Sequence, residues 1–449
     1  MNKTKNSPMT GFSKLSKYEK IDLVIKNYFS GSESAKAELK KFWHSDEPIQ
    51  KSIDEFSENT LTNFLFPFGV VPNVMINDNI YCVPMVIEES SVVAASSKAA
   101  NFWLTRGGFH AEVLSTTKVG QVHFLWLGDS KKLFNFFEAV KLDLLKSTEG
   151  LTHNMQKRNG GLLSLKLVDK TIEEPGYFQL YAEFETVDAM GANFINSVLE
   201  QLAKTFKAMI SAPNDHNCDF SDSERDVQII MAILSNFTPD CKVRAFVECD
   251  IEDMVDANSG MTAQEYVEKF ARAIKISKID VTRATTHNKG IFNGIDAVVI
   301  ATGNDYRAVE ACGHAYAARD GVYRGLSDVS LNNGKFRMTL EIPLAIGTVG
   351  GLTSLHPLSR LALDMLGRPN AQELMKIIAC IGLAQNFAAV NSLITSGIQK
   401  GHMKMHLMNI LNHLEANEVE RNNAKKHFEN EVISFKSVRD YISTSRDYP

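Results

Sequence analysis

The chain has 449 residues, with 48 basic and 53 acidic side chains and a formal net charge of −5. At about 150 residues per domain, this length predicts roughly three structural units. The acidic balance excludes the basic surface typical of proteins that bind nucleic acid or anionic membranes. The six cysteines form no C-x-x-C pair. We therefore expect neither a zinc ribbon nor a disulfide framework. His402 and His406 have the spacing of metal ligands on a helix, but no glutamate stands between them as in zinc proteases, so we expect no metal site.

The N-terminal sequence lacks the apolar core of a signal peptide. No run of apolar residues approaches the roughly 20 that a membrane helix needs. Scattered cysteines in an acidic chain are typical of a reducing compartment. The sequence therefore predicts a cytoplasmic protein without a membrane span.

The spacing of apolar residues predicts the elements in chain order. Helices are expected over about 18–43 and 89–104. A strand at 120–127 and a helix at 133–145 follow, then strands at 161–168 and 177–184 and a helix at 188–209. Beyond the polar stretch 211–224 we expect helices at 225–236 and 262–274, a buried strand at 294–301, a strand at 336–342 and a long helix after Pro369. Residues from Ser396 onward are polar and helical.

This order predicts an α+β protein with a discontinuous organisation. We expect a large mixed helical and sheet domain over 1–109 and 223–395, which binds substrate and dimerises. A small α/β sandwich of ferredoxin-like type is inserted at 110–222, and a helical flap follows at 396–449. The chain has no G-x-G-x-x-G after a strand and no P-loop, so the small domain is not expected to be a Rossmann fold.

Two adjacent glutamates, Glu88 and Glu89, open the apolar helix at 89–104. The purely structural interpretation is that they complement the helix dipole. The functional interpretation is that one of them is partly buried and acts as a general acid. The sequence leaves both open.

The stretch from Lys289 to Ala308 reads KGIFNGIDAVVIATGNDYRA. We interpret Lys289 and Asn293 as lying in a glycine-rich loop that approaches a ligand, followed by the buried strand. Asp305 stands where a helix N-cap belongs, which is its structural explanation. Charged and amide side chains gathered around glycines nevertheless favour a binding site.

Two further segments allow both kinds of interpretation. In ETVDAMGAN, Asp188 is expected to cap a helix whose small first residues leave backbone N–H groups open to an anion, or simply allow close packing. In GIQKGH, His402 follows a glycine hinge and is either a gated acid or a surface histidine.

Taken in order, these segments resemble the hydroxymethylglutaryl-CoA reductases, and most closely the soluble class II enzymes. The resemblance rests on the blocks SENTLTNFLFPFGVVPN, EESSVVAASSKAA, DAMGAN, KGIFNGIDAVVIATGND, GTVGG and GIQKGHM. Two positions depart from the family pattern: Ser90 stands where the family usually has proline, and Thr62 where it often has glycine.

The resemblance implies a role for each matching residue. The catalytic residues would be Glu89, Lys289, Asp305 and His402. Substrate contacts would come from Ser91, Asn236, Arg283, Asn293 and Gln385, and the dinucleotide motif from Asp188, Met190, Gly191, Ala192 and Asn193. In this mechanism Lys289 stabilises the oxyanion, Asp305 lies between Lys289 and Glu89, and His402 protonates the departing coenzyme A thiolate.

The implied reaction reduces hydroxymethylglutaryl-CoA to mevalonate and free coenzyme A with two molecules of NADPH or NADH. Lys157 and Arg158 are basic candidates for the ribose 2′-phosphate, so we favour NADPH. The same catalyst running in reverse with NAD⁺ is the alternative, and a non-catalytic CoA-binding homologue is a remote one. The family also implies a homodimer with an interfacial active site, and possibly a hexamer.

Overall fold

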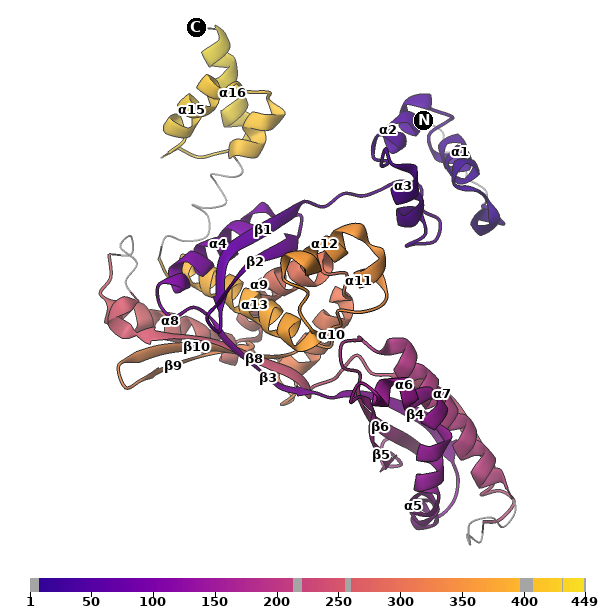
Figure 1. Ribbon diagram of the computed structural model, residues 1–449. Coiled ribbons are helices and arrows are strands. Elements are labelled where there is room, and N and C mark those ends of the chain that lie inside the picture. The colour runs from indigo at the N-terminus through magenta and orange to yellow at the C-terminus, as the bar shows by residue number, and fades with distance from the viewer. Residues whose placement is uncertain (1–7, 213–219, 255–259, 396–406, 430, 448–449) are drawn as a thin grey trace.

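A computed structural model describes residues 8–447 apart from 213–219, 255–259, 396–406 and 430 (Figure 1). Within this part of the chain, buried apolar side chains form one large cluster, a second cluster in the small sheet and a third near the C-terminus. The fold is mixed α/β, as the sequence predicts at this level of detail.

The large cluster surrounds a four-stranded antiparallel sheet with the strand order β3-β8-β10-β9. Its strands are β3 (His110–Thr116), β8 (Cys241–Asp250), β9 (Ser327–Asn332) and β10 (Lys335–Pro343). A hairpin of β1 (Phe68–Ile76) and β2 (Asn79–Val86) joins it, with helices α4 (Ser90–Leu104), α8 (Ala263–Ile279), α9 (Val281–Ala301) and α13 (Ala371–Ile394).

Helix α13 is the centre of this cluster. It begins with a capping box between Asn370 and Glu373 and contacts α9, α4, α8 and the sheet. Among the described residues it is the one helix long and apolar enough to cross a membrane, but 83% of its most apolar window is buried inside the protein. Its apolar composition therefore reflects a place in the core.

The second cluster belongs to a sheet of order β5-β6-β4-β7, antiparallel throughout. The strands are β4 (Lys118–Trp126), β5 (Gly161–Asp169), β6 (Tyr177–Glu185) and β7 (Val227–Leu234). Helices α5 (Ser130–Ser147), α6 (Glu149–Gln156) and α7 (Ala192–Ser211) accompany it. Strand β6 buries alternate residues, as expected for a sheet covered on one face.

Several predicted elements are confirmed, and the expected helix at 225–236 is wrong. Residues 227–234 form strand β7, which pairs with β4. A short apolar run does not distinguish a helix from a strand, and this one is rich in β-branched residues. The boundaries 110 and 222 also cut across the sheets, because β3 pairs with β8 of the large cluster while β7 belongs to the small sheet.

The expected strand at 294–301 is also wrong. Residues 281–301 form one continuous helix, α9, which begins at the N-cap Asp280. Lys289 and Asn293 therefore lie in mid-helix and not in a glycine-rich loop. Gly294 has a packing role instead, since a Cβ there would lie 2.8 Å from the carbonyl oxygen of Ile381 in α13. The buried, β-branched residues of α9 produced the strand-like signal.

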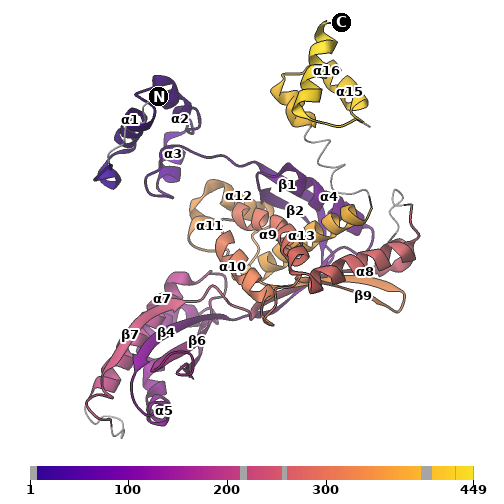
Figure 2. The ribbon, with the colours of Figure 1, turned by 180° about the vertical axis from the view of Figure 1, so that it is seen from behind.

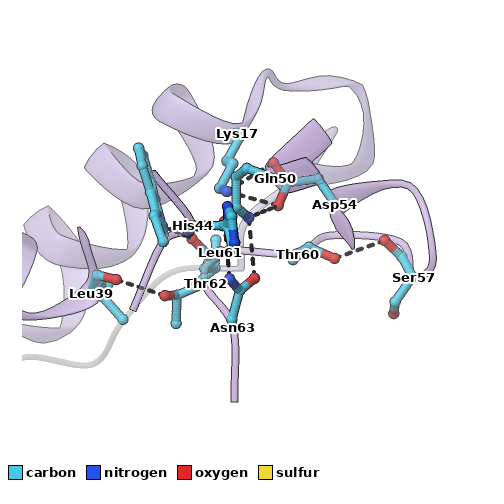
Figure 3. Close-up of polar contacts among 11 residues, drawn as sticks. Lys17, Leu39, His44, Gln50, Asp54, Ser57, Thr60, Leu61, Thr62 and Asn63 are labelled. Carbon is cyan, nitrogen blue, oxygen red and sulfur yellow. Dashed lines mark hydrogen bonds and ion pairs between the residues drawn. The ribbon is translucent and has the colours of Figure 1, made fainter. Parts of the chain in front are cut away.

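The N-terminal helices α1 (Lys17–Tyr28), α2 (Glu33–Lys41) and α3 (Glu47–Asp54) stand apart from the sheets in both views (Figures 1 and 2). The expected single helix at 18–43 is divided by the left-handed residues Ser30 and Gly31. Gln50 exchanges amide hydrogen bonds of 2.9 and 3.1 Å with Asn63 (Figure 3). Thr62 donates to the carbonyl oxygen of Leu39 at 2.6 Å, so its departure from the family glycine adds an anchor.

The remaining described elements connect these units or form the third cluster. Helices α10 (Tyr306–Ala317), α11 (Leu352–Leu355) and α12 (Pro357–Met365) follow α9 and β10, with short 3-10 turns at Phe12–Lys14 and Ile251–Asp253. The third cluster lies within residues 407–442 and includes α15 (Glu418–His427) and α16 (Phe435–Asp447).

Candidate active site

Glu89 and Lys289 meet across 200 residues of sequence. Glu89 is the N-cap residue of α4, with extended backbone angles of φ −87° and ψ 108°. Ser91 Oγ donates to its Oε1 at 2.8 Å, and Lys289 Nζ donates to its Oε2 at 3.3 Å. The Glu89 side chain is 33% exposed and the Lys289 side chain 65%. The pair is thus held in place yet open to a substrate.

Helix α9 presents Asn293 four residues after Lys289, so the two share a helix face. Arg283 lies one and a half turns before Lys289 and is half-buried. Burial lowers the pKa of its guanidinium, and no other described residue bonds to it. A half-buried cation without a protein anion is well suited to a carboxylate or phosphate ligand.

Gln385 lies behind this face. It is buried in α13 and accepts a hydrogen bond of 2.8 Å from the hydroxyl of Ser96 in α4. A Cβ on Gly294 would lie 3.0 Å from the Gln385 Cβ, so α9 and α13 are in close contact here. Asn236 is exposed between β7 and β8, and no described contact joins it to Glu89 or Lys289.

Asp305 lies at the opposite end of α9 from this group. The helix continues for twelve residues beyond Lys289, or about 18 Å of rise, before Asp305 caps α10. Within the described chain Asp305 bonds to Arg307 and to the backbone N–H groups of Arg307 and Ala308. The expectation that Asp305 lies between Lys289 and Glu89 is therefore not met within one chain.

The DAMGAN motif lies where the small sheet meets the large cluster. The expectation that Asp188 caps α7 is wrong. Its Oδ1 accepts from the backbone N–H of Ala371 at 2.8 Å, so it caps the start of α13 instead. The N-cap of α7 is Gly191, with φ 91°, and Ala192 and Asn193 form its first turn. A side chain at Gly347 would clash with the backbone of Met190, so the GTVGG loop touches the motif.

Lys157 and Arg158 are exposed and follow α6. Gly160, two residues on, packs against the segment before the motif, because a Cβ there would lie 2.7 Å from the carbonyl oxygen of Glu185 and 3.0 Å from Val187. The basic pair therefore lies in the neighbourhood of the dinucleotide motif. His402 lies outside the described residues, so its place in the site stays a prediction.

Sequence reasoning missed one buried ion beneath the motif. Lys118 is 5% exposed, and its Nζ donates to Thr186 Oγ1 at 2.5 Å and to the carbonyl oxygens of Ala189 and Met190 at 2.8 and 3.2 Å. Burial lowers the pKa of this ammonium. No motif marks Lys118; only the pairing of β4 with β6 brings it under the loop. Among the described residues, no group of three His, Cys, Asp or Glu side chains could hold a metal.

The bonded pair of Glu89 and Lys289 offers a carboxyl that can act as an acid and a cation that can stabilise an oxyanion. The sequence profile described as hydroxymethylglutaryl-coenzyme A reductase matches residues 20–407. The chain belongs to this family, whose members are oxidoreductases.

Similar proteins support the same family. The 3-hydroxy-3-methylglutaryl-coenzyme A reductase of Archaeoglobus fulgidus is 33% identical over 90% of this chain and 87% of its own. A probable reductase of Borreliella burgdorferi is 32% identical over 81% and 80%.

Solved structures narrow the class. A Streptococcus pneumoniae 3-hydroxy-3-methylglutaryl-coenzyme A reductase matches with a TM-score of 0.71 and 34% identity, over 98% of this chain and 100% of that one. The class II enzyme of the same species, bound to NADPH in open conformations, matches with a TM-score of 0.69 and 36% identity over 87% and 100%. Together these matches place the chain with the class II reductases.

Proposed function

We propose that this chain reduces (S)-3-hydroxy-3-methylglutaryl-CoA to (R)-mevalonate and free coenzyme A, with NADPH as the hydride donor. The bond between Lys289 and Glu89 is the observation that carries the proposal, because it joins two family motifs 200 residues apart. The relatives from Archaeoglobus fulgidus and Borreliella burgdorferi are named as reductases, so the oxidative direction is not favoured. The assignment of a role to each residue rests on the family motifs and on this geometry.

The nicotinamide would supply a hydride in each of two reductions. The first addition places negative charge on the thioester oxygen, and the Lys289 ammonium stabilises that oxyanion. His402 protonates the departing thiolate, since an imidazole titrates near neutral pH. Glu89 then protonates the aldehyde oxygen in the second reduction. Ser91 fixes the Glu89 carboxyl, and Arg283 with Asn293 holds the charged end of the acyl group.

The residues at the junction fit a dinucleotide. Gly191 has φ 91°, and a side chain there would clash with Thr186, so this position requires glycine. The backbone N–H groups that begin α7 would bind a phosphate of the dinucleotide. Lys157 and Arg158 lie near the motif and would bind a 2′-phosphate. We propose the small sheet with α5 and α7 as a ferredoxin-like nucleotide domain, bounded near residues 117 and 235 because β3 pairs outside it and β7 inside it.

We further propose a homodimer with the active site at its interface, and residues 396–449 as a flap. Asp305 follows Lys289 after about 18 Å of helix along α9, which supports a site whose aspartate comes from a second copy. Large apolar side chains are exposed on this chain: Phe64 is 87% exposed and Leu65 68%, and Leu355, Leu358 and Leu361 of α11–α12 are 63%, 48% and 51% exposed. Such a patch is typical of an interface. A cytoplasmic location is consistent with the free cysteines among the described residues.

The test is NADPH oxidation that depends on hydroxymethylglutaryl-CoA. Wild-type protein is expected to turn over, whereas Lys289→Ala should bind the substrate and oxidise no NADPH above background. Removing an oxyanion-stabilising donor costs about 10²–10³ in kcat. Normal turnover in Lys289→Ala would refute the mechanism, and no turnover in the wild type would refute the function.

A further inference from the structure

Asp305 is held more tightly than a helix cap requires. As the N-cap residue of α10, its Oδ1 accepts from the backbone N–H groups of Arg307 at 3.0 Å and Ala308 at 3.2 Å. The Arg307 guanidinium adds a fork: Nε donates to Oδ1 and Nη2 to Oδ2, both at 3.1 Å. Residues two apart do not face each other within a helix, so this fork exists only because Asp305 has extended backbone angles.

The bonds divide the two carboxylate oxygens unequally. Among the described residues, Oδ1 receives three donors, while Oδ2 receives only Nη2 of Arg307. A carboxylate offers about four lone-pair positions, so Oδ2 retains acceptor capacity toward another cation. The Asp305 side chain is 32% exposed, so the carboxylate is partly open to solvent. The arrangement fixes one oxygen and presents the other.

We propose that Arg307 is a positioning residue, which holds the Asp305 carboxylate ionised and turns Oδ2 toward the lysine that it serves. The inference rests on the proposed function, in which Asp305 supports the protonated Lys289 of the second copy. It assigns a role to a residue that no family block in the sequence includes.

The charge of Arg307 supports the same role. Its hydrogen bonds lower the pKa of the Asp305 carboxyl below the ordinary value. In the described chain Arg307 is the charged side chain bonded to Asp305, and the Tyr306 ring lies beside the guanidinium, 5.9 Å from it. An ionised Asp305 keeps the proton on Lys289, where it stabilises the oxyanion. Lysine at position 307 would keep the charge but lose the fork.

The first test compares Arg307→Gln and Arg307→Lys in the full-length protein. Arg307→Gln is expected to lower kcat about tenfold, with Arg307→Lys between it and the wild type, and to leave the KM for NADPH unchanged. Arg368→Gln is the matched control: Arg368 follows α12, pairs with Asp364 of that helix at 2.6 Å and is 81% exposed. This control should retain wild-type kcat and thermal midpoint.

The second test separates positioning from direct substrate contact. In an Asp305→Asn background, adding Arg307→Gln should change neither the residual rate nor the calorimetric affinity for hydroxymethylglutaryl-CoA. A further loss of affinity in the double variant would overturn the proposal and make Arg307 a substrate contact. Unchanged kcat in Arg307→Gln would also overturn it. Full activity of Asp305→Asn alone would instead contradict the role of Asp305 in the proposed function.

Discussion

The two ends of α9 differ in how many predicted site residues bond to one another there. At the N-terminal half, Lys289 meets Glu89 of α4, and Ser91 fixes the carboxyl within the same chain. Beyond the C-terminal end, Asp305 bonds only to its own loop and helix among the described residues. Both ends carry family motifs. One folded chain therefore assembles the acid and the lysine, and in the proposed dimer its aspartate serves another copy.

Subunit complementation tests this comparison with the largest effect. Lys289→Ala and Asp305→Asn homodimers are each expected to be inactive. A heterodimer of the two should recover about half of wild-type activity, because its two-fold symmetry gives one intact site and one doubly defective site. Differently tagged chains can be co-expressed, purified and assayed by NADPH oxidation. A heterodimer as inactive as its parents would place Lys289 and Asp305 of one chain in one site.

Substitutions of the two adjacent glutamates test the group around Lys289 and Glu89. Glu89→Gln should lower kcat by about 10²–10⁴, since it removes the proposed general acid of the second reduction. The neighbouring Glu88 is exposed, and Glu88→Gln is the matched control with near wild-type kcat. The loss should persist when mevaldehyde replaces the thioester. Equal losses in both variants would show that the segment, and not the carboxyl of Glu89, matters.

A smaller effect is expected at the dinucleotide motif. Replacing both Lys157 and Arg158 with alanine should lower kcat/KM for NADPH about tenfold and leave that for NADH unchanged, because only NADPH carries a 2′-phosphate. Lys146→Ala is the control, since Lys146 lies in the same unit and is 67% exposed. Parallel losses with both cofactors would place the 2′-phosphate elsewhere.

The smallest effects are expected at two glycines of α9, one packed against α13 and one with open space around it. Gly294→Ala should destabilise the fold by about 1–3 kcal/mol, because its Cβ meets the Ile381 carbonyl oxygen at 2.8 Å. Gly290→Ala is matched in chemistry, but a Cβ there has no atom within 4 Å. This variant should gain about 0.5–1 kcal/mol from helix propensity. Urea unfolding measures both; destabilisation of equal size would mean that α13 does not press on α9 at Gly294.

The local pattern of apolar residues predicts much of the fold. It fails where contacts with distant segments decide between a helix and a strand. Strands β4, β5, β6 and β10 and helices α4, α8 and α13 follow from periodicity and caps. Residues 227–234 and 294–301 were assigned the wrong element because a short apolar, β-branched run fits a strand or a helix equally well, and only its neighbours choose.

The candidate site was predictable in residue type but not in arrangement. The motifs supplied Glu89 and Lys289, and the structure shows them bonded. Asp188 was expected to cap the helix that follows it, but it caps α13 instead, at residue 371. That partner lies 183 residues away, so no local rule identifies it. The same holds for Lys118, whose role depends on strand pairing alone.

A two-step reduction is tested by the ratio of NADPH oxidised to coenzyme A thiol released. Purified protein with hydroxymethylglutaryl-CoA should consume two NADPH for each thiol, because thioester and aldehyde are reduced in turn. A ratio of one would mean that reduction stops at the aldehyde. Thiol release without NADPH oxidation would mean hydrolysis, and either result would contradict the account.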